Sequence, residues 1–138
     1  MASKEERSGN KQWNVKVYTS DLDNVSFEGT DSKVFVQLMG TLDESDKIVL
    51  DKSKALSKSK DLFEAGQCDE FLVSTDVLGK LQKIKIGHDN SGFGSGWHCN
   101  RVEIRNQLTG TTYTFPCNNW LSKDEGDKKI ERVLENPT

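Results

Sequence analysis

Large apolar and polar residues alternate along Trp13-Asn14-Val15-Lys16-Val17-Tyr18-Thr19. Successive side chains of a β-strand point to opposite faces of a sheet, so this alternation predicts a strand with one buried face. By the same reasoning, strands are expected in chain order at 13–19, 33–39, 47–50, 69–74, 81–86, 97–105 and 111–117. Polar and glycine-rich turns separate these segments, which is typical of an antiparallel β-sandwich.

The two ends of the chain follow other patterns. Residues 1–12 are polar and without periodicity, so they are expected to form a disordered leader. Ile130, Val133 and Leu134 are spaced as on one face of a helix. The sequence therefore predicts a short helix within residues 127–135.

Length and charge narrow the class of protein. A chain of 138 residues is long enough for one domain and one core. The 19 basic and 22 acidic residues are interspersed, which argues against a nucleic-acid-binding protein, because phosphate recognition needs a clustered basic surface. One lysine-rich stretch, Lys47 to Lys60, fits either a solvated loop or a patch for anionic lipid headgroups.

No stretch of the sequence is apolar enough for a signal peptide or a spanning helix. The cysteines Cys68, Cys99 and Cys117 are odd in number and irregularly spaced, unlike a disulfide framework. Cys99 and Cys117 fall in expected strands and are expected to be small buried hydrophobes. These features favour a reducing, cytoplasmic setting.

Motifs for catalysis are missing from the sequence. There is no Gly-x-Ser-x-Gly elbow, and only His88 and His98 could act as an imidazole base. The spacing of these histidines and of the cysteines matches no zinc site. The sequence therefore indicates a protein that is not an enzyme.

Acidic loops offer a different chemistry. Calcium prefers oxygen ligands held on loops. The segments 21–31, 61–69 and 89–90 are rich in carboxylate and amide oxygens, and a sandwich can gather its loops at one end. An EF-hand at Asp21 is rejected, because Ser26 and Ser32 stand where that loop needs Gly and Glu. On pattern alone, solvated turns and a calcium site both stay open, with turns favoured.

Read together, the strands and loops resemble the PLAT (lipoxygenase homology, LH2) domain. The pieces that carry the resemblance follow one another in family order, and they are Trp13-x-Val15-x-Val17-x-Thr19, Gly29-Thr30-Asp31-Ser32-x-Val34, Phe63-Glu64-Ala65-Gly66-x-x-Asp69-x-Phe71, Ile84-x-Ile86-x-His88-Asp89-Asn90-x-Gly92, and Phe115-Pro116-Cys117-Asn118-Asn119-Trp120-Leu121. The resemblance implies an eight-stranded antiparallel sandwich of two four-stranded sheets over residues 13–122. The His-Asp-Asn-x-Gly block is most similar to proteins built of tandem PLAT repeats, in which residues 123–138 would be a tail or an inter-repeat linker.

The resemblance also implies a site and a function. Calcium in this family is held by loops at one end of the sandwich, and the matching positions here are Gly29, Asp31, Asp61, Glu64, Gly66, Asp89 and Asn90. Leu62 departs from the family pattern, in which several members carry an acid, and this argues against a second ion unless Asp61 and Glu64 take the place of that acid. The apolar residues expected to contact a membrane are Phe27, Phe93 and Trp120, and Trp120 fits a place in the core equally well.

The expected function is a non-catalytic, calcium-binding targeting module, monomeric as an isolated domain and peripheral to a membrane. It would dock on membrane lipid headgroups or on a membrane-associated protein. Two alternatives are a protein-protein scaffold repeat in which calcium is only structural, and a targeting domain of a larger lipid-metabolising enzyme.

Overall fold

A computed structural model describes residues 11–22, 29–57, 61–92 and 96–136. Its elements are β1 (Gln12–Thr19), β2 (Val34–Gly40), β3 (Ile48–Val49), β4 (Cys68–Ser74), β5 (Leu81–His88), β6 (Trp97–Asn106), β7 (Thr112–Leu121) and β8 (Glu131–Glu135). The predicted strands are thus present, and the described part of the chain contains no helix. In particular, nothing in those ranges could cross a bilayer as an apolar helix.

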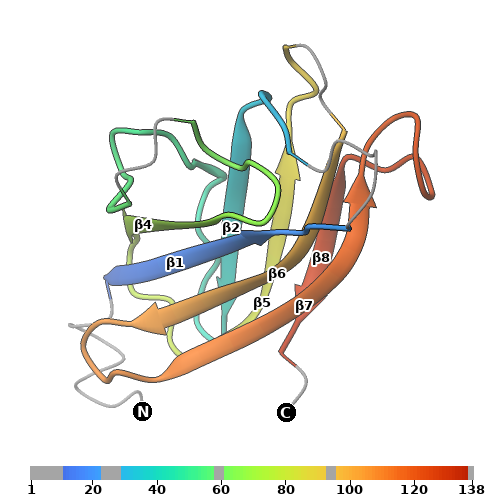
Figure 1. The fold of residues 1–138 in the computed structure, drawn as a ribbon. Coiled ribbons are helices and arrows are strands. Elements are labelled where there is room, and N and C mark those ends of the chain that lie inside the picture. The colour runs from blue at the N-terminus through green and yellow to red at the C-terminus, as the bar shows by residue number, and fades with distance from the viewer. Residues whose placement is uncertain (1–10, 23–28, 58–60, 93–95, 137–138) are drawn as a thin grey trace.

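The strands form two four-stranded sheets packed face to face (Figure 1). The order is β4-β1-β6-β7 in the first sheet and β3-β2-β5-β8 in the second. Every strand pairing is antiparallel, so the predicted eight-stranded sandwich is confirmed. Long connections let the chain pass from one sheet to the other, which places loops at the ends of the sandwich.

The core lies between the sheets, where the alternation along each strand places the apolar side chains. Trp13, Val15 and Val17 of β1 are fully buried. The indole N–H of Trp13 donates to the Thr75 hydroxyl at 3.0 Å, and that of Trp97 donates to the Thr19 hydroxyl at 3.0 Å. A buried indole that keeps a hydrogen-bond partner loses little on desolvation, so both tryptophans stabilise the packing as expected.

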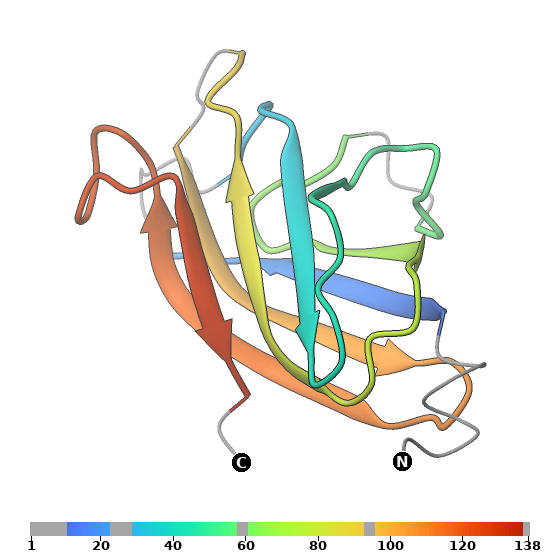
Figure 2. The same cartoon turned by 180° about the vertical axis from the view of Figure 1, so that it is seen from behind.

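The helix predicted near the C-terminus is wrong, because this segment forms strand β8. β8 pairs with β5, with Leu134 opposite Ile84 and Val133 opposite Lys85 (Figure 2). Leu134 is buried and Val133 is exposed, which is the alternation of a strand. The spacing of the apolar residues is compatible with a helix and with a strand. The strand forms because the open edge of β5 offers backbone hydrogen-bond partners along its length. The second sheet thus takes its last strand from the segment 123–138.

Candidate functional site

Three loops that are far apart in the sequence meet at one end of the sandwich. The Thr30 N–H donates to the Phe63 carbonyl at 3.1 Å, which ties the β1–β2 loop to the segment before β4. The Asp89 N–H donates to the Lys33 carbonyl at 3.1 Å, which ties the β5–β6 loop to the end of the β1–β2 loop, just before β2. The acidic segments predicted to gather are therefore brought together by backbone hydrogen bonds.

Gly29 lies directly against the second acidic loop. A Cβ atom at this position would lie 2.7 Å from the Phe63 carbonyl oxygen and 3.0 Å from the Glu64 Oε2 atom. A side chain at position 29 would therefore displace the backbone of the second loop. The sequence needs glycine here so that the loops that carry Asp31 and Glu64 can approach each other.

The carboxylates of these two loops influence one another electrostatically. Burial raises the pKa of Glu64, and the negative charges of Asp31, Asp61 and Asp69 raise it further. Within the described ranges, no lysine, arginine or histidine forms an ion pair with Asp31, Asp61 or Glu64. Among the described residues, these like charges are therefore held together without an ion pair.

Beside these carboxylates lies a hollow of about 220 Å³. It is lined by Asp31 and Lys33 from the first loop, Asp61 and Phe63 from the second, and residues 49–52. Three carboxylates and two lysines, Lys33 and Lys52, lie along its lining, and its volume leaves room for an ion together with water.

Asp69 is a residue of this region to which the sequence assigned no role. Its carboxylate is fully buried, and it accepts hydrogen bonds from the Phe63 N–H at 2.8 Å and the Gln67 side-chain amide at 2.7 Å. Burial raises the pKa of Asp69, whereas these two donors lower it. Asp69 therefore holds the second loop in shape. Its inward-facing place in the alternation of β4 was the signal that a structural role was possible.

The third loop is ordered by its own acid. Asp89 Oδ1 accepts the N–H groups of Lys33 at 3.1 Å and Ser91 at 3.0 Å, together with the Ser91 hydroxyl. These bonds, first that from the Ser91 hydroxyl, lower the pKa of Asp89. Asn90 follows in a left-handed conformation with φ of 59°, and its N–H donates to His88 Nδ1 at 2.9 Å. His88 is buried and bonds through Nε2 to the Leu121 carbonyl at 2.6 Å, so it fastens this loop to β7.

The remaining predicted site residues have separate surroundings. Gly66 lies against Asp21, with its N–H bonded to the Ser20 carbonyl at 3.2 Å. Trp120 is half-buried in β7, where it meets the His98 ring edge-on at a centroid distance of 5.1 Å. Phe27 and Phe93 lie outside the described residues. A membrane contact by these aromatic residues stays a prediction.

The residues fit calcium in type but do not form a closed cage. Within the described ranges, no three side chains of His, Cys, Asp or Glu are close enough together to hold a metal ion. Calcium, however, takes about six to eight oxygens, many of them from backbone carbonyls and water. The uncompensated carboxylates of Asp31, Asp61 and Glu64 beside the Gly29 backbone are the feature that such a cation would satisfy.

Comparison with known proteins supports the resemblance. The sequence model of the PLAT/LH2 domain matches residues 13–135. Mouse (Mus musculus) lipoxygenase homology domain-containing protein 1 is 38% identical over 125 residues, which is 91% of this chain and 6% of that protein. The chain thus spans a small fraction of its relative.

Solved structures of lipoxygenases share the fold. A coral 8R-lipoxygenase, described as activated by calcium through a C2-like domain, aligns with a TM-score of 0.73 and 27% identity over 91% of this chain and 17% of that chain. A calcium-dependent 11R-lipoxygenase aligns with a TM-score of 0.65 and 25% identity over 91% of this chain and 17% of that one. With the family match over most of its length, the chain belongs to the PLAT/LH2 domain family.

Proposed function

We propose that this chain is a non-catalytic, calcium-binding targeting module that docks on membrane lipid or on a membrane-associated protein. The observation that carries the proposal is the group of carboxylates at the loop end. Burial raises the pKa of Glu64, the charges of Asp31, Asp61 and Asp69 raise it further, and no cation of the described residues pairs with Asp31, Asp61 or Glu64. Such crowding is unfavourable unless an external cation compensates for it.

The proposed ligands come from all three loops. They are the carboxylates of Asp31, Asp61, Glu64 and Asp89, the Asn90 side chain, and the carbonyls of Gly29 and Gly66. Calcium bound there would neutralise the loops and hold them together. The two calcium-regulated lipoxygenases with the same fold support this assignment.

The two histidines support a non-catalytic role. His88 and His98 are both buried, and each bonds to a neighbouring segment, His88 to the Leu121 carbonyl at 2.6 Å and His98 to the Ser20 hydroxyl at 2.7 Å. Both imidazoles therefore serve the packing of β-strands and loops. A general base needs contact with a substrate, which these positions do not offer.

Neutralising the loop end would let it approach an anionic surface. Calcium would remove the repulsion between the acidic loops and lipid headgroups, and Phe27, Phe93 and Trp120 would contribute apolar contact. The three cysteines of this chain are free thiols, which supports the cytoplasmic side of a membrane.

Two alternative functions take into account that this chain spans only a small part of its relatives. The chain is 6% of lipoxygenase homology domain-containing protein 1, which is compatible with one repeat of a long protein. The first alternative is a scaffold repeat that contacts proteins, with calcium stiffening the loops. The chain is 17% of the coral lipoxygenase, which favours a targeting domain of a larger enzyme.

Calorimetric titration with calcium tests the metal site. The wild type is expected to release or absorb heat on binding, and Asp31→Asn and Glu64→Gln are expected to weaken binding strongly. Asp76→Asn is the matched control, because Asp76 is an exposed acid outside the three loops. Absence of binding by the wild type would refute the calcium assignment.

Sedimentation with phosphatidylserine vesicles then separates the targets. Calcium-dependent sedimentation that is lost in Glu64→Gln supports lipid docking. Calcium binding without sedimentation supports the scaffold role instead.

A further inference from the structure

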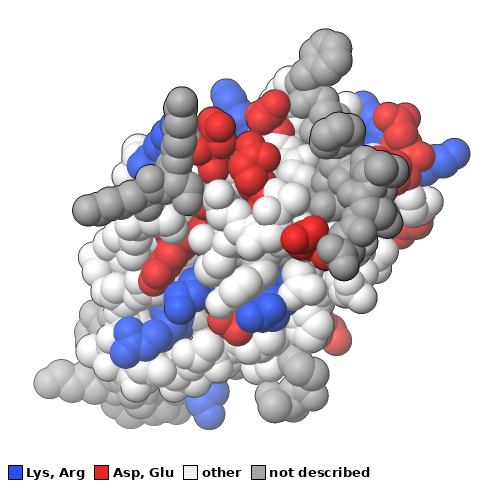
Figure 3. All heavy atoms as spheres, viewed as in Figure 1, with Lys and Arg blue, Asp and Glu red and all other residues white. Residues whose placement is uncertain are grey.

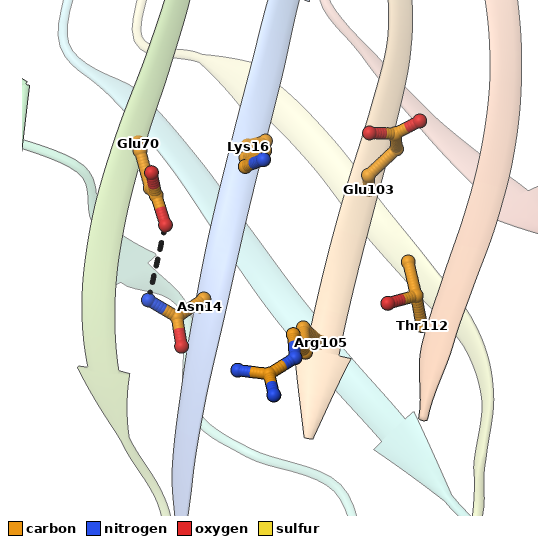
Figure 4. A pocket seen from close by; sticks show the side chains of 6 residues that line it. All are labelled: Asn14, Lys16, Glu70, Glu103, Arg105 and Thr112. Carbon is orange, nitrogen blue, oxygen red and sulfur yellow. Dashed lines mark hydrogen bonds between the residues drawn. The ribbon is translucent and has the colours of Figure 1, made fainter. Parts of the chain in front are cut away.

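The outer face of the first sheet has a polar hollow of about 240 Å³ (Figure 4). Side chains from all four strands of the sheet line it, namely Glu70 of β4, Asn14 and Lys16 of β1, Glu103 and Arg105 of β6, and Thr112 of β7. None of these residues is among the candidate calcium ligands. The hollow is therefore a second feature, independent of the loop end.

The strand register explains this lining. The alternation that buries Trp13, Val15 and Val17 turns Asn14 and Lys16 outward. Cross-strand pairing then places Lys16 opposite both Glu70 and Glu103, and Asn14 opposite Arg105. Charged side chains from separate parts of the sequence thus share a single surface.

Hydrogen bonds within the sheet engage the carboxylates of this surface. Glu103 accepts the Tyr18 hydroxyl at 2.9 Å and the Arg101 Nε–H at 3.3 Å, and the Arg101 guanidinium lies 3.7 Å above the Tyr18 ring. One oxygen of Glu70 accepts the Asn14 side-chain amide at 3.1 Å. These bonds fix the walls of the hollow and leave one Glu70 oxygen as an acceptor.

Among the described residues, the two cations of the hollow, Lys16 and Arg105, lack the hydrogen bonds that the two carboxylates make. In the part of the chain that the structure describes, the side chains of Lys16 and Arg105 form no ion pair or hydrogen bond. Arg105 reaches from β6 toward Asn14 on β1, and Lys16 projects from the sheet (Figure 4). Together with Arg101, which pairs with Glu103, this surface carries the cations Lys16, Arg101 and Arg105 against the anions Glu70 and Glu103. Its charge is therefore slightly positive, in a chain whose net charge is −3.

We propose that this hollow binds an acidic segment of a protein partner, with a carboxylate placed between Lys16 and Arg105. A guanidinium presents a planar pair of N–H donors that matches a carboxylate, and an ammonium adds a second charged contact. The remaining oxygen of Glu70 can accept an N–H of the bound peptide. A peptide supplies both groups, which fits the mixed charge of the lining.

This surface fits a peptide better than a membrane. The six residues that line the hollow include no large apolar side chain, so its lining offers nothing that would enter a bilayer. Glu70 and Glu103 would repel a continuous layer of anionic headgroups but tolerate one inserted carboxylate. Basic side chains gather on the lower part of this side of the molecule, below most of the acidic ones (Figure 3).

Fluorescence anisotropy with a labelled hexaglutamate peptide tests the proposal. EDTA is present throughout, so that calcium does not contribute to peptide binding. A negative result for the calcium site therefore leaves this test unaffected. The wild type is expected to bind hexaglutamate in a salt-dependent manner and to ignore hexaglutamine. The Lys16→Glu/Arg105→Glu variant is expected to lose about tenfold or more in affinity, since a charged hydrogen bond is worth at least about the 1.4 kcal/mol that makes a factor of ten.

The matched control reverses two exposed lysines elsewhere, Lys83→Glu and Lys123→Glu, and should keep wild-type affinity. Equal losses in both double variants would show general attraction and overturn the proposal, as would absence of wild-type binding. Phosphatidylserine vesicles that bind in EDTA through Lys16 and Arg105 would also overturn it in favour of lipid. Amide chemical shifts of the wild type with hexaglutamate should change along β1 and β6, a result that does not depend on how the variants fold.

Discussion

Two loops of this molecule contain carboxylates whose pKa values are shifted in opposite directions. In the segment 61–67, burial and the charges of Asp31, Asp61 and Asp69 raise the pKa of Glu64. In the segment 122–130, the Arg132 guanidinium donates to Asp127 Oδ1 at 2.6 Å and lowers the pKa of that carboxyl. Among the described residues, the first of these two loops, 61–67, has no ion pair for its carboxylates, whereas Asp127 of the second, 122–130, is paired with Arg132.

The difference shows where a partner is needed. Arg132 lies at the start of β8 and also donates to the Trp120 carbonyl at 3.1 Å, so the last strand supplies the cation for the loop that precedes it. No strand supplies one to Asp61 or Glu64 within the described ranges. Segment 61–67 has two acids and no basic residue, whereas segment 122–130 has three acids with three lysines of its own and the Arg132 partner. The first segment is therefore the better candidate for a cation site.

The largest effect is expected from detaching the first loop from the core. Phe63 is buried, stacks on Phe71 at a ring distance of 5.7 Å and meets Trp97 edge-on at 5.6 Å. Phe63→Ala removes these contacts and should lower the free energy of unfolding by about 3–5 kcal/mol. Urea denaturation measures the change. The control Leu108→Ala, at a residue that is 55% exposed, should stay within about 0.5 kcal/mol of the wild type.

The second-largest effect is expected in the stabilisation by calcium, which should depend on the first loop and not on the second. A ligand at a hundredfold excess over its Kd stabilises the folded state by about 2.7 kcal/mol, because it binds the native protein and not the unfolded chain. Thermal unfolding with and without calcium should show this gain for the wild type and for Asp124→Asn in the second loop. Asp61→Asn should lose most of it. An equal gain in both variants would place the ion elsewhere.

Most of the fold could be predicted because period-two alternation survives in strands that are buried on one face. Where the sequence failed, the missing information was the partner strand. Ile130, Val133 and Leu134 suit a helix locally, and only the open edge of β5 makes them a strand. His88 and Leu121 likewise extend β5 and β7 beyond the predicted ends, because Val34 and Trp97 lie opposite them in the ladder.

The candidate site was predictable as a set of loops but not in its electrostatics. The resemblance pointed to Asp31, Asp61 and Glu64, and the structure places these residues close enough for the first two to raise the pKa of the third. Sequence reasoning assigned no role to Asp69, whose buried carboxylate shapes segment 61–67. The sequence does separate segment 61–67, which has no basic residue, from segment 122–130, which has three lysines. It does not show that Arg132 is the partner of Asp127, because the pairing of β8 places that residue.

Glu64→Gln isolates the charge of the first loop. A carboxyl whose pKa is raised by folding costs stability when it is ionised, so in EDTA the variant should be more stable than the wild type at neutral pH. The gain is at most about 0.5 kcal/mol, because Glu64 is exposed and solvent screens its charge. It should fade as the pH falls through the raised pKa toward the ordinary value of 4.5, where the wild-type side chain also becomes neutral. Urea denaturation across this pH range measures the difference.

Asp127→Asn is the mirror experiment in the second loop, and its effect should be the smallest. Asparagine keeps an oxygen that can accept from Arg132 and from the Lys129 N–H, so the substitution removes little besides the charge. A carboxyl whose pKa is lowered by folding adds stability above its ordinary value of 3.8, and that stability is lost as the pH falls through the lowered pKa. The variant should therefore be slightly less stable than the wild type at neutral pH, and the difference should disappear in acid. If neutralising Asp127 stabilises the protein as Glu64→Gln does, Arg132 does not compensate the second loop and the contrast between the two loops fails. Opposite signs from two removals of one negative charge would show that the surroundings of each loop, and not its acidity, decide which one needs a cation from outside.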